Sequence, residues 1–175
     1  PLVARRLAAE DLDARLVAGV VSEEIRVMTR RAAELAEAAM AEAGTGGPPC
    51  SYAMMVLGSG GRGESLLAPD QDNAIVFEHG EPDGPEDRWF AELGARVADI
   101  LDAAGIPYCK GGVMARNPQW RGSLALWQER IGHWIGRPRA EDLLNVDIFF
   151  DQRPVHGDLS LGAALFDRAF EAASG

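Results

Sequence analysis

The first quarter of the chain has apolar residues at helical spacing. Across residues 10–43, apolar side chains recur every three or four positions, and Arg and Glu fill many of the others. This periodicity predicts one long amphipathic helix, or two helices with a break near residues 19–22. The stretch GTGGPP at residues 44–49 ends the pattern, because glycine suits a helix C-terminus and proline cannot continue a helix.

Shorter apolar runs follow, separated by glycine, proline and polar residues. Four of them predict strands, within residues 51–59, 73–77, 106–110 and 143–155. Three others have helical spacing, at residues 86–104, 123–135 and 159–173. The order is strand-strand-helix-strand-helix-strand-helix after the first helix, which predicts a mixed sheet with helices packed on it.

A glycine-rich stretch separates the first two predicted strands. The glycines at 58, 60 and 63 have the G-x-G-x-x-G spacing of dinucleotide-binding folds. That fold returns to a parallel strand through a crossover helix, and only nine residues, interrupted by Pro69, separate Gly63 from Asn73. A P-loop is excluded because no Lys-Ser or Lys-Thr follows the glycines. We therefore reject both interpretations and expect Glu78 at a solvated strand end.

Two carboxylates lie one residue apart just before the second predicted strand. Asp70 and Asp72 are expected on one face, where they could share one or two hard divalent cations. The turn formed by Gly58 and Ser59 lets backbone N–H groups and a hydroxyl approach a phosphate, and Arg62 could add charge-assisted contacts. A glycine turn followed 11 to 12 residues later by D-x-D is what metal-assisted nucleotidyl transfer needs.

Charge and composition exclude other classes of function. A net charge of −10 over 175 residues argues against nonspecific nucleic-acid binding, which needs a Lys/Arg surplus. No apolar run approaches the roughly 20 residues of a membrane span, and the first segment does not have the pattern of a signal peptide. Cys50 and Cys109 cannot form a C-x-x-C site, so we expect reduced thiols in a cytoplasmic protein without membrane contact.

The stretch GSGGRGESLLAPDQDNAIVF resembles the G-S-x(n)-D-x-D motif of the DNA polymerase β-like nucleotidyltransferase superfamily. It is similar to the branch with the PII-protein uridylyltransferases and glutamine synthetase adenylyltransferases. It is closer still to bacterial nucleotidyltransferases that accompany CBS or cyclic-nucleotide-binding domains. Four ordered motifs within residues 29–158 carry this resemblance: GSGGRGE, DQDNA, KGGVMARNPQWRGSL and IFFDQRPVHGD. It implies an α+β fold, with a palm-like short mixed sheet flanked by helices and an N-terminal helical extension.

The resemblance also implies catalytic roles. Asp70 and Asp72 would hold two Mg²⁺ ions, with Mn²⁺ as the alternative, while Gly58 and Ser59 hold the β- and γ-phosphates. The superfamily uses a third carboxylate on a later strand. Asp147 and Asp151 lie four residues apart in VDIFFD, which places them on one face of the predicted strand. The pattern F-F-D-x-R-P favours Asp151, and Asp147 is the fallback.

Other positions leave alternatives open. Arg62 and Glu64 match the R-G-E of the branch and are candidates for nucleotide binding, although Glu64 could instead cap a short helix. Lys110, at the end of the third predicted strand, could meet a triphosphate or remain a solvated lysine. The loop at residues 116–121 could face a base or substrate, or consist of a packed Trp120 with surface arginines.

The implied activity is Mg-dependent transfer of a nucleoside monophosphate from an NTP to an acceptor, with a protein side chain suggested as acceptor. The alternatives are a noncatalytic regulatory module that binds Mg-nucleotide, and metal-dependent phosphodiester hydrolysis. We expect helical residues 1–47, a nucleotidyltransferase core at 48–158, and the start of a C-terminal helical region at 159–175. The absence of an initial Met favours a segment of a longer signalling protein, with sensory domains upstream and a helical domain downstream.

Overall fold

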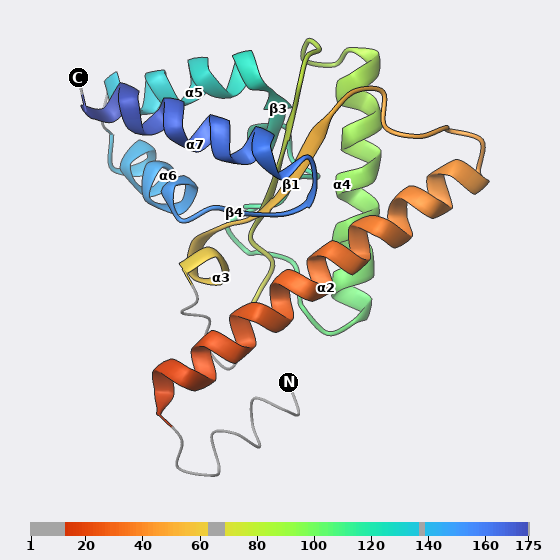
Figure 1. Ribbon diagram of the computed structural model, residues 1–175, viewed down its shortest axis with the longest axis horizontal. Coiled ribbons are helices and arrows are strands. Elements are labelled where there is room, and N and C mark those ends of the chain that lie inside the picture. Colours follow the sequence, from red (N-terminus) through yellow and green to blue (C-terminus); the bar gives the residue numbers. More distant parts are fainter. Residues whose placement is uncertain (1–12, 63–68, 137–138, 175) are drawn as a thin grey trace.

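The computed structural model describes residues 13–62, 69–136 and 139–174, and its centre is a four-stranded sheet (Figure 1). The strand order is β3-β2-β1-β4. These strands are β1 (Tyr52–Val56), β2 (Asn73–Phe77), β3 (Arg121–Ser123) and β4 (Arg153–Gly157). Strand β1 runs antiparallel to β2 and β4, whereas β2 and β3 are parallel. The prediction of a short mixed sheet flanked by helices is confirmed.

Helices cover both faces of the sheet (Figure 1). One face carries α2 (Ala14–Glu42) and α4 (Pro85–Ala103). The other carries α5 (Leu124–Gly136), α6 (Ala140–Phe150) and α7 (Leu159–Ser174), while α3 (Gly58–Arg62) and a 3₁₀ turn (Pro118–Trp120) are short connections. None of the helices in the described part of the chain combines the length and apolar character that a membrane crossing requires.

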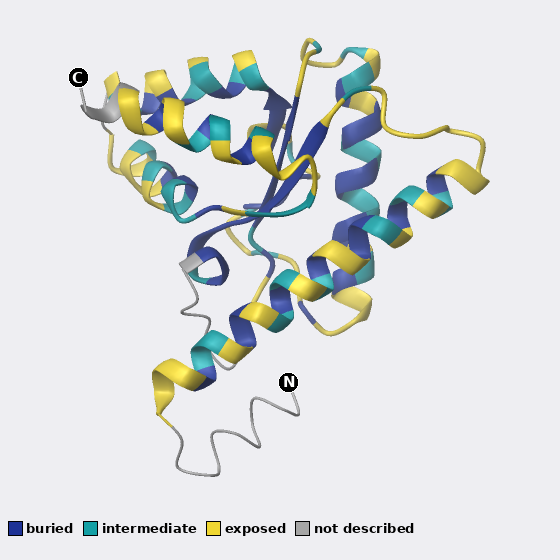
Figure 2. Cartoon of the chain, in the orientation of Figure 1, coloured by how far each residue is buried: buried dark blue, intermediate teal, exposed yellow. Residues whose placement is uncertain are grey.

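Both central strands are buried on their two faces (Figure 2). Successive side chains point to opposite sides, so β1 supplies Met54 to the core under α2 and α4, and Met55 to the core under α5, α6 and α7. Strand β2 likewise divides Ile75 and Val76 between the two cores. This explains why both strands read as continuous apolar runs rather than as alternating patterns.

Several predicted elements are confirmed with small changes of boundary. Helix α2 is continuous through residues 19–22, so the single-helix alternative is correct. Asp13 caps its start by accepting a bond from Arg15 N, and Gly44 follows its end with φ +83°. Strand β2 has the predicted bounds. The antiparallel pairing of β1 with β2 also confirms the rejection of a dinucleotide-binding crossover, and Glu78 is exposed as expected.

The predicted strand at residues 106–110 is wrong. That segment runs beside the entry to β2 as irregular chain, where Pro107 O accepts a bond from Gln71 N (3.0 Å) and Val113 O accepts one from Asn73 N (3.0 Å). The edge strand is instead β3, at the junction of the predicted loop and the helix predicted from residue 123, and it pairs with β2 from Ile75–Arg121 onward. Three residues of sequence Arg-Gly-Ser offer no apolar alternation, so only the pairing with β2 defines this strand.

The expected strand position of Asp147 and Asp151 is also wrong. Residues 140–150 form helix α6, with exposed Asp147 on it and Asp151 as its C-cap. The fourth strand begins only at Arg153, near the end of the predicted range. Acidic Glu141 and Asp142 in the first turn favour a helix start there, whereas the apolar run behind them fits either a helix or a strand.

Candidate functional site

The glycine turn and the D-x-D pair meet at one end of the sheet. Val56, the last residue of β1, is paired with Asn73, the first residue of β2. Just beyond this pair, Leu57 N donates a hydrogen bond to Asp72 O (2.9 Å). Antiparallel pairing therefore brings the two motifs side by side, although about a dozen residues separate them in the chain.

Gly58 and Gly61 are required by close approaches within the turn. Gly58 has φ +55°, and a Cβ there would lie 3.0 Å from Asp72 Oδ2. A Cβ on Gly61 would overlap the backbone carbonyl of Asp151. Glycine removes both obstructions and allows the left-handed conformation at position 58. The turn is thus packed against the D-x-D pair on one side and against the C-cap of α6 on the other.

Two buried amides orient the D-x-D segment. Gln71 lies between the aspartates, and its Nε2 donates to Ala98 O and Ile106 O, both at 2.9 Å. The next residue but one, Asn73, accepts a bond at Oδ1 from Ala115 N (2.9 Å). Because Gln71 points into the protein, the aspartates on either side of it are left outward, Asp70 exposed and Asp72 half-buried. The sequence did not lead us to expect either amide. The signal for them was the alternation of Gln71 and Asn73 with the two aspartates.

The surroundings of Asp72 disfavour its charged form. Its pKa is raised to about 6, chiefly by burial and also by the nearby charge of Asp70, while a hydrogen bond with the Cys109 thiol acts in the opposite direction. Burial also raises the pKa of Cys109 to about 11, with the Asp72 charge contributing and bonds from the Val113 and Gly111 backbone opposing. Cys109 therefore stays a neutral thiol beside the pair, a contact that its position in the sequence did not predict.

The donor set fits a hard divalent cation. Within the described residues, neither Asp70 nor Asp72 forms an ion pair, so no basic side chain described there relieves their repulsion. Carboxylate oxygens are the ligands that Mg²⁺ prefers, and a cation would stabilise the ionised form of Asp72. The described ranges contain no group of three or more His, Cys, Asp and Glu side chains arranged for a metal, so no third protein carboxylate joins the pair there.

The remaining predicted site residues lie at different distances from this centre. Asp151 is half-buried and reaches the turn through its backbone carbonyl at Gly61, whereas Asp147 is exposed along α6. Lys110 is exposed in the turn after Cys109, where Gly112 N bonds Cys109 O (3.1 Å). Ser59 is half-buried within α3. Arg62 ends α3, and its side chain lies outside the described part of the molecule, as does all of Glu64.

The loop at residues 116–121 is mostly a packing element. Trp120 is buried, with its ring centroid 6.3 Å from that of Trp127 and 5.9 Å from that of Trp134. Arg121 is buried as well, and its Nε donates to Asp87 Oδ1 (2.8 Å). The packed-Trp alternative is confirmed, but Arg121 is not a surface arginine. Arg116 is the exposed one, 3.4 Å from Asp99.

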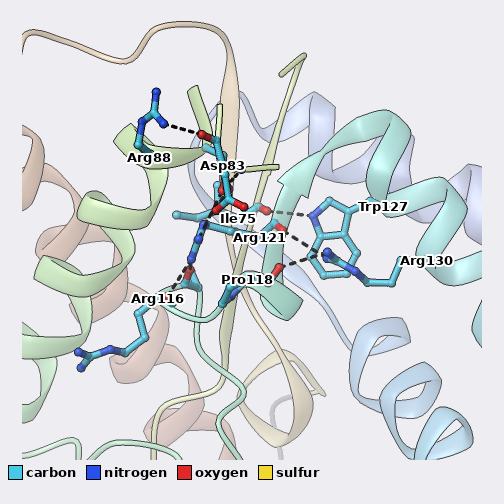
Figure 3. Close-up of polar contacts among 10 residues, drawn as sticks. Ile75, Asp83, Arg88, Arg116, Pro118, Arg121, Trp127 and Arg130 are labelled. Atoms are coloured by element: carbon cyan, nitrogen blue, oxygen red, sulfur yellow. Dashed lines mark hydrogen bonds and ion pairs between the residues drawn. The ribbon is translucent and has the colours of Figure 1, made fainter. Parts of the chain in front are cut away.

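A second guanidinium completes this cluster (Figure 3). Arg130 lies over the Trp127 ring (4.8 Å to the centroid) and donates to Arg121 O and Pro118 O at 3.3 and 3.1 Å. Burial lowers its pKa to about 10; the Asp87 carboxylate opposes this change, and the Arg121 charge adds to it. Arg121 and Arg130 donate their hydrogen bonds to backbone carbonyls and to Asp87. The cluster therefore holds β3 and α5 in place and is not arranged to bind a ligand.

Comparison with known proteins identifies a family for this chain. The family model described as "Putative nucleotidyltransferase DUF294" matches residues 1–141, which is most of the chain. That span includes the glycine turn, both aspartates and Lys110, and it ends before Asp151. No curated protein matches the chain.

Proposed function

The chain belongs to the nucleotidyltransferase family DUF294, and from this membership we propose that it transfers a nucleoside monophosphate from an NTP to an acceptor in an Mg-dependent reaction. The observation that carries the proposal is the contact between the glycine turn and the D-x-D pair, with Gly58 directly against the Asp72 carboxylate. A triphosphate held on this turn would lie beside the two carboxylates. Positioning and charge neutralisation are what phosphoryl chemistry chiefly requires.

Each residue has a defined part in this proposal. Asp70 and Asp72 hold Mg²⁺, with Mn²⁺ as the alternative, and the ions supply charge neutralisation for the triphosphate. Backbone N–H groups at Gly58 and Ser59, with the Ser59 hydroxyl, bind the β- and γ-phosphates. Basic side chains add to this, with Arg62 and Lys110 as candidates, while Glu64 is expected to support the turn.

Bond formation follows from this placement. The acceptor oxygen forms a bond to the α-phosphorus, pyrophosphate leaves, and the acceptor proton passes to a carboxylate. Asp151 is our candidate for that carboxylate, because its backbone lies against Gly61, and Asp147, exposed on α6, is the fallback. The acceptor class suggested by resemblance to PII-protein uridylyltransferases is a protein side chain. Sensory and helical domains beyond the core at residues 48–158 fit the same proposal.

A second candidate is a module that binds Mg-nucleotide without turnover. The observation in its favour is that, among the described residues, no third carboxylate joins Asp70 and Asp72 in a metal-binding group. Two carboxylates suffice to bind a nucleotide-associated cation, whereas activation of an acceptor needs a further base.

Labelled NTPs separate the two candidates. The full-length protein and a cell extract are incubated with Mg²⁺ and each of four NTPs labelled at the α-phosphate. Transfer predicts label on an acceptor, release of pyrophosphate, and loss of both in Asp72→Asn. Glu42→Gln, an exposed change at the end of α2, serves as the control and should retain activity. Mg-dependent NTP binding without label or pyrophosphate would instead establish the noncatalytic module.

A further inference from the structure

Arg26 joins helix α2 to the glycine turn. Its Nε donates to Gly60 O at 3.1 Å, and its Nη2 donates to Gly61 O at 2.8 Å, across more than 30 positions of sequence. The side chain is 24% exposed, so most of it is buried. Figure 1 shows α3 beside the N-terminal half of α2, where these contacts occur. No other side chain in the described residues donates to these two carbonyls.

The geometry of this contact suits arginine in particular. The last carbonyls of any helix lack partners within the helix, and α3 has only five residues. A planar guanidinium can bond two neighbouring oxygens at once, and its charge strengthens both bonds. Its third nitrogen, Nη1, lies 3.2 Å from Glu23 Oε2, which holds the guanidinium in orientation from the solvent side.

The turn is fixed from two further directions. Gly61 packs against the Asp151 carbonyl, and Gly61 N bonds Leu57 O (3.2 Å) at the end of β1. Gly58 packs against Asp72. The Arg26 fork therefore bonds the turn to α2, whereas these other contacts set the turn relative to the sheet and α6.

We propose that Arg26 is a positioning residue that couples nucleotide binding to the seating of α2. The inference rests on the proposed nucleotide site at Gly58 and Ser59. With its carbonyl side held by Arg26, the turn presents its N–H groups to phosphate in one fixed orientation. Coupling between two events is reciprocal, so a bound nucleotide must also hold α2 more firmly against the turn.

Nucleotide titration tests the first half of this proposal. The wild type, Arg26→Gln and Arg26→Lys are titrated with ATP, GTP, CTP and UTP in Mg²⁺. Arg26→Gln should weaken binding of the preferred nucleotide by at least about tenfold, because two charge-assisted bonds are lost. The affinity of Arg26→Lys should lie between those of the wild type and Arg26→Gln, because an ammonium group keeps the charge but lacks the two-pronged geometry of a guanidinium. The matched control is Arg31→Gln on the same helix, whose exposed side chain pairs with Glu34 (2.8 Å), and it should stay within about twofold of wild type.

Hydrogen exchange tests the coupling itself. Without nucleotide, the amides of residues 58–61 should exchange faster in Arg26→Gln than in wild type or Arg31→Gln. With nucleotide, exchange along α2 near residue 26 should slow in wild type, and this slowing should be absent from Arg26→Gln at saturating nucleotide. A residue that merely stabilised the fold would lower the melting temperature without removing that response.

The outcomes also separate this inference from the proposed function. If the wild type binds nucleotide and Arg26→Gln binds it equally well, the positioning role is overturned. If the wild type binds no nucleotide, the proposed function fails. In that case, unchanged exchange of residues 58–61 in Arg26→Gln would overturn the inference too, and faster exchange would support the positional contact. Arg26→Lys supplies the same comparison should Arg26→Gln fail to fold.

Discussion

Asp72 shows at the level of one residue how a binding site can oppose stability. Its carboxylate is half-buried between Gly58 and Cys109, with Asp70 close enough to raise its pKa. An ionised acid in such surroundings destabilises the folded protein unless a cation compensates it. The residue that we propose to hold Mg²⁺ is therefore one that the fold by itself would prefer neutral.

Replacing Asp72 by Asn should stabilise the protein when divalent cations are absent. The pKa of Asp72 is about 6 in the fold and about 4 in an unfolded chain, so its ionisation costs the fold at most about 3 kcal/mol. This cost is absent below about pH 4, grows as the pH rises toward 6, and is complete above 6. Urea unfolding of wild type and Asp72→Asn in EDTA, from pH 4 to 8, measures the difference.

Two results would contradict that account. One is an Asp72→Asn variant that is less stable than wild type at pH 7 in EDTA. The other is a stabilisation by Mg²⁺ that is as large in the variant as in wild type, because a ligand stabilises only the protein that binds it. Glu42→Gln provides the control for the removal of one negative charge from an acidic protein.

Gly61 makes a second prediction at this scale. Substitution by Ala would force a Cβ into the Asp151 carbonyl, so either the turn or the C-cap of α6 must move. Overpacking of this kind should destabilise the protein by at least about 2 kcal/mol. A Cβ on Gly132, in α5, would have no atom within 4 Å, so Gly132→Ala should be neutral or stabilising by up to about 1 kcal/mol. Denaturant unfolding of the two variants tests this, and equal stabilities would contradict it.

At the scale of elements, β3 is held by a buried ion pair rather than by apolar packing alone. Arg121 in β3 bonds Asp87 in α4, and both side chains are less than 10% exposed. Arg121 also donates to the carbonyls of Ala115 and Arg116. One arginine thus ties three segments together at the edge of the sheet.

Arg121→Met should therefore lower the free energy of unfolding without disturbing the proposed nucleotide site. Removing one partner leaves the Asp87 carboxylate buried without compensation, at a cost of about 3 to 5 kcal/mol. Arg116→Met, which removes an exposed arginine, should cost less than about 1 kcal/mol. Nucleotide affinity, measured below the unfolding temperature, should be unchanged in both. A loss of nucleotide affinity in Arg121→Met but not in Arg116→Met would indicate instead that the loop at residues 116–121 faces the substrate.

At the scale of the whole molecule, α2 spans the sheet and is fastened at two places. Near the proposed site, Arg26 binds the glycine turn. At the opposite end of β1, Glu37 Oε1 accepts bonds from the Tyr52 hydroxyl and, at 3.0 Å, from His156 Nε2 of β4. The first contact reaches a candidate binding element, whereas the second reaches only strands.

Glu37→Gln should consequently separate stability from binding. The loss of a charged acceptor shared by two donors should cost about 1 to 2 kcal/mol. Nucleotide affinity should stay within about twofold of wild type, in contrast to Arg26→Gln, because the contact lies at the far end of β1. Parallel unfolding and titration of the two variants make the comparison. An equal loss of affinity in both would mean that any loosening of α2 disturbs the turn.

Much of the fold was predictable because its signals are local. The apolar runs of β1 and β2 and the periodic stripes of α2, α4, α5 and α7 lie within short windows of sequence. The residue count between Gly63 and Asn73 excluded a crossover helix, and the antiparallel pairing of β1 with β2 agrees. The proximity of Gly58 to Asp72 follows from the same count, because in two adjacent antiparallel strands the end of the first lies beside the start of the second.

Tertiary contacts decided the rest. Strand β3 forms because β2 offers it a hydrogen-bonding partner. Residues 106–110 do not pair with β2 as a strand and instead accept isolated hydrogen bonds from the D-x-D segment. The apolar run before Asp151 fits a helix or a strand equally, and packing against α5 selects the helix. Gln71 bonds Ala98 and Ile106, Cys109 bonds Asp72, and Arg26 bonds Gly60 and Gly61, contacts that span 27 to 37 positions of the chain. Sequence patterns determine which residues can be buried or charged, but contacts over such separations form only once the chain has folded.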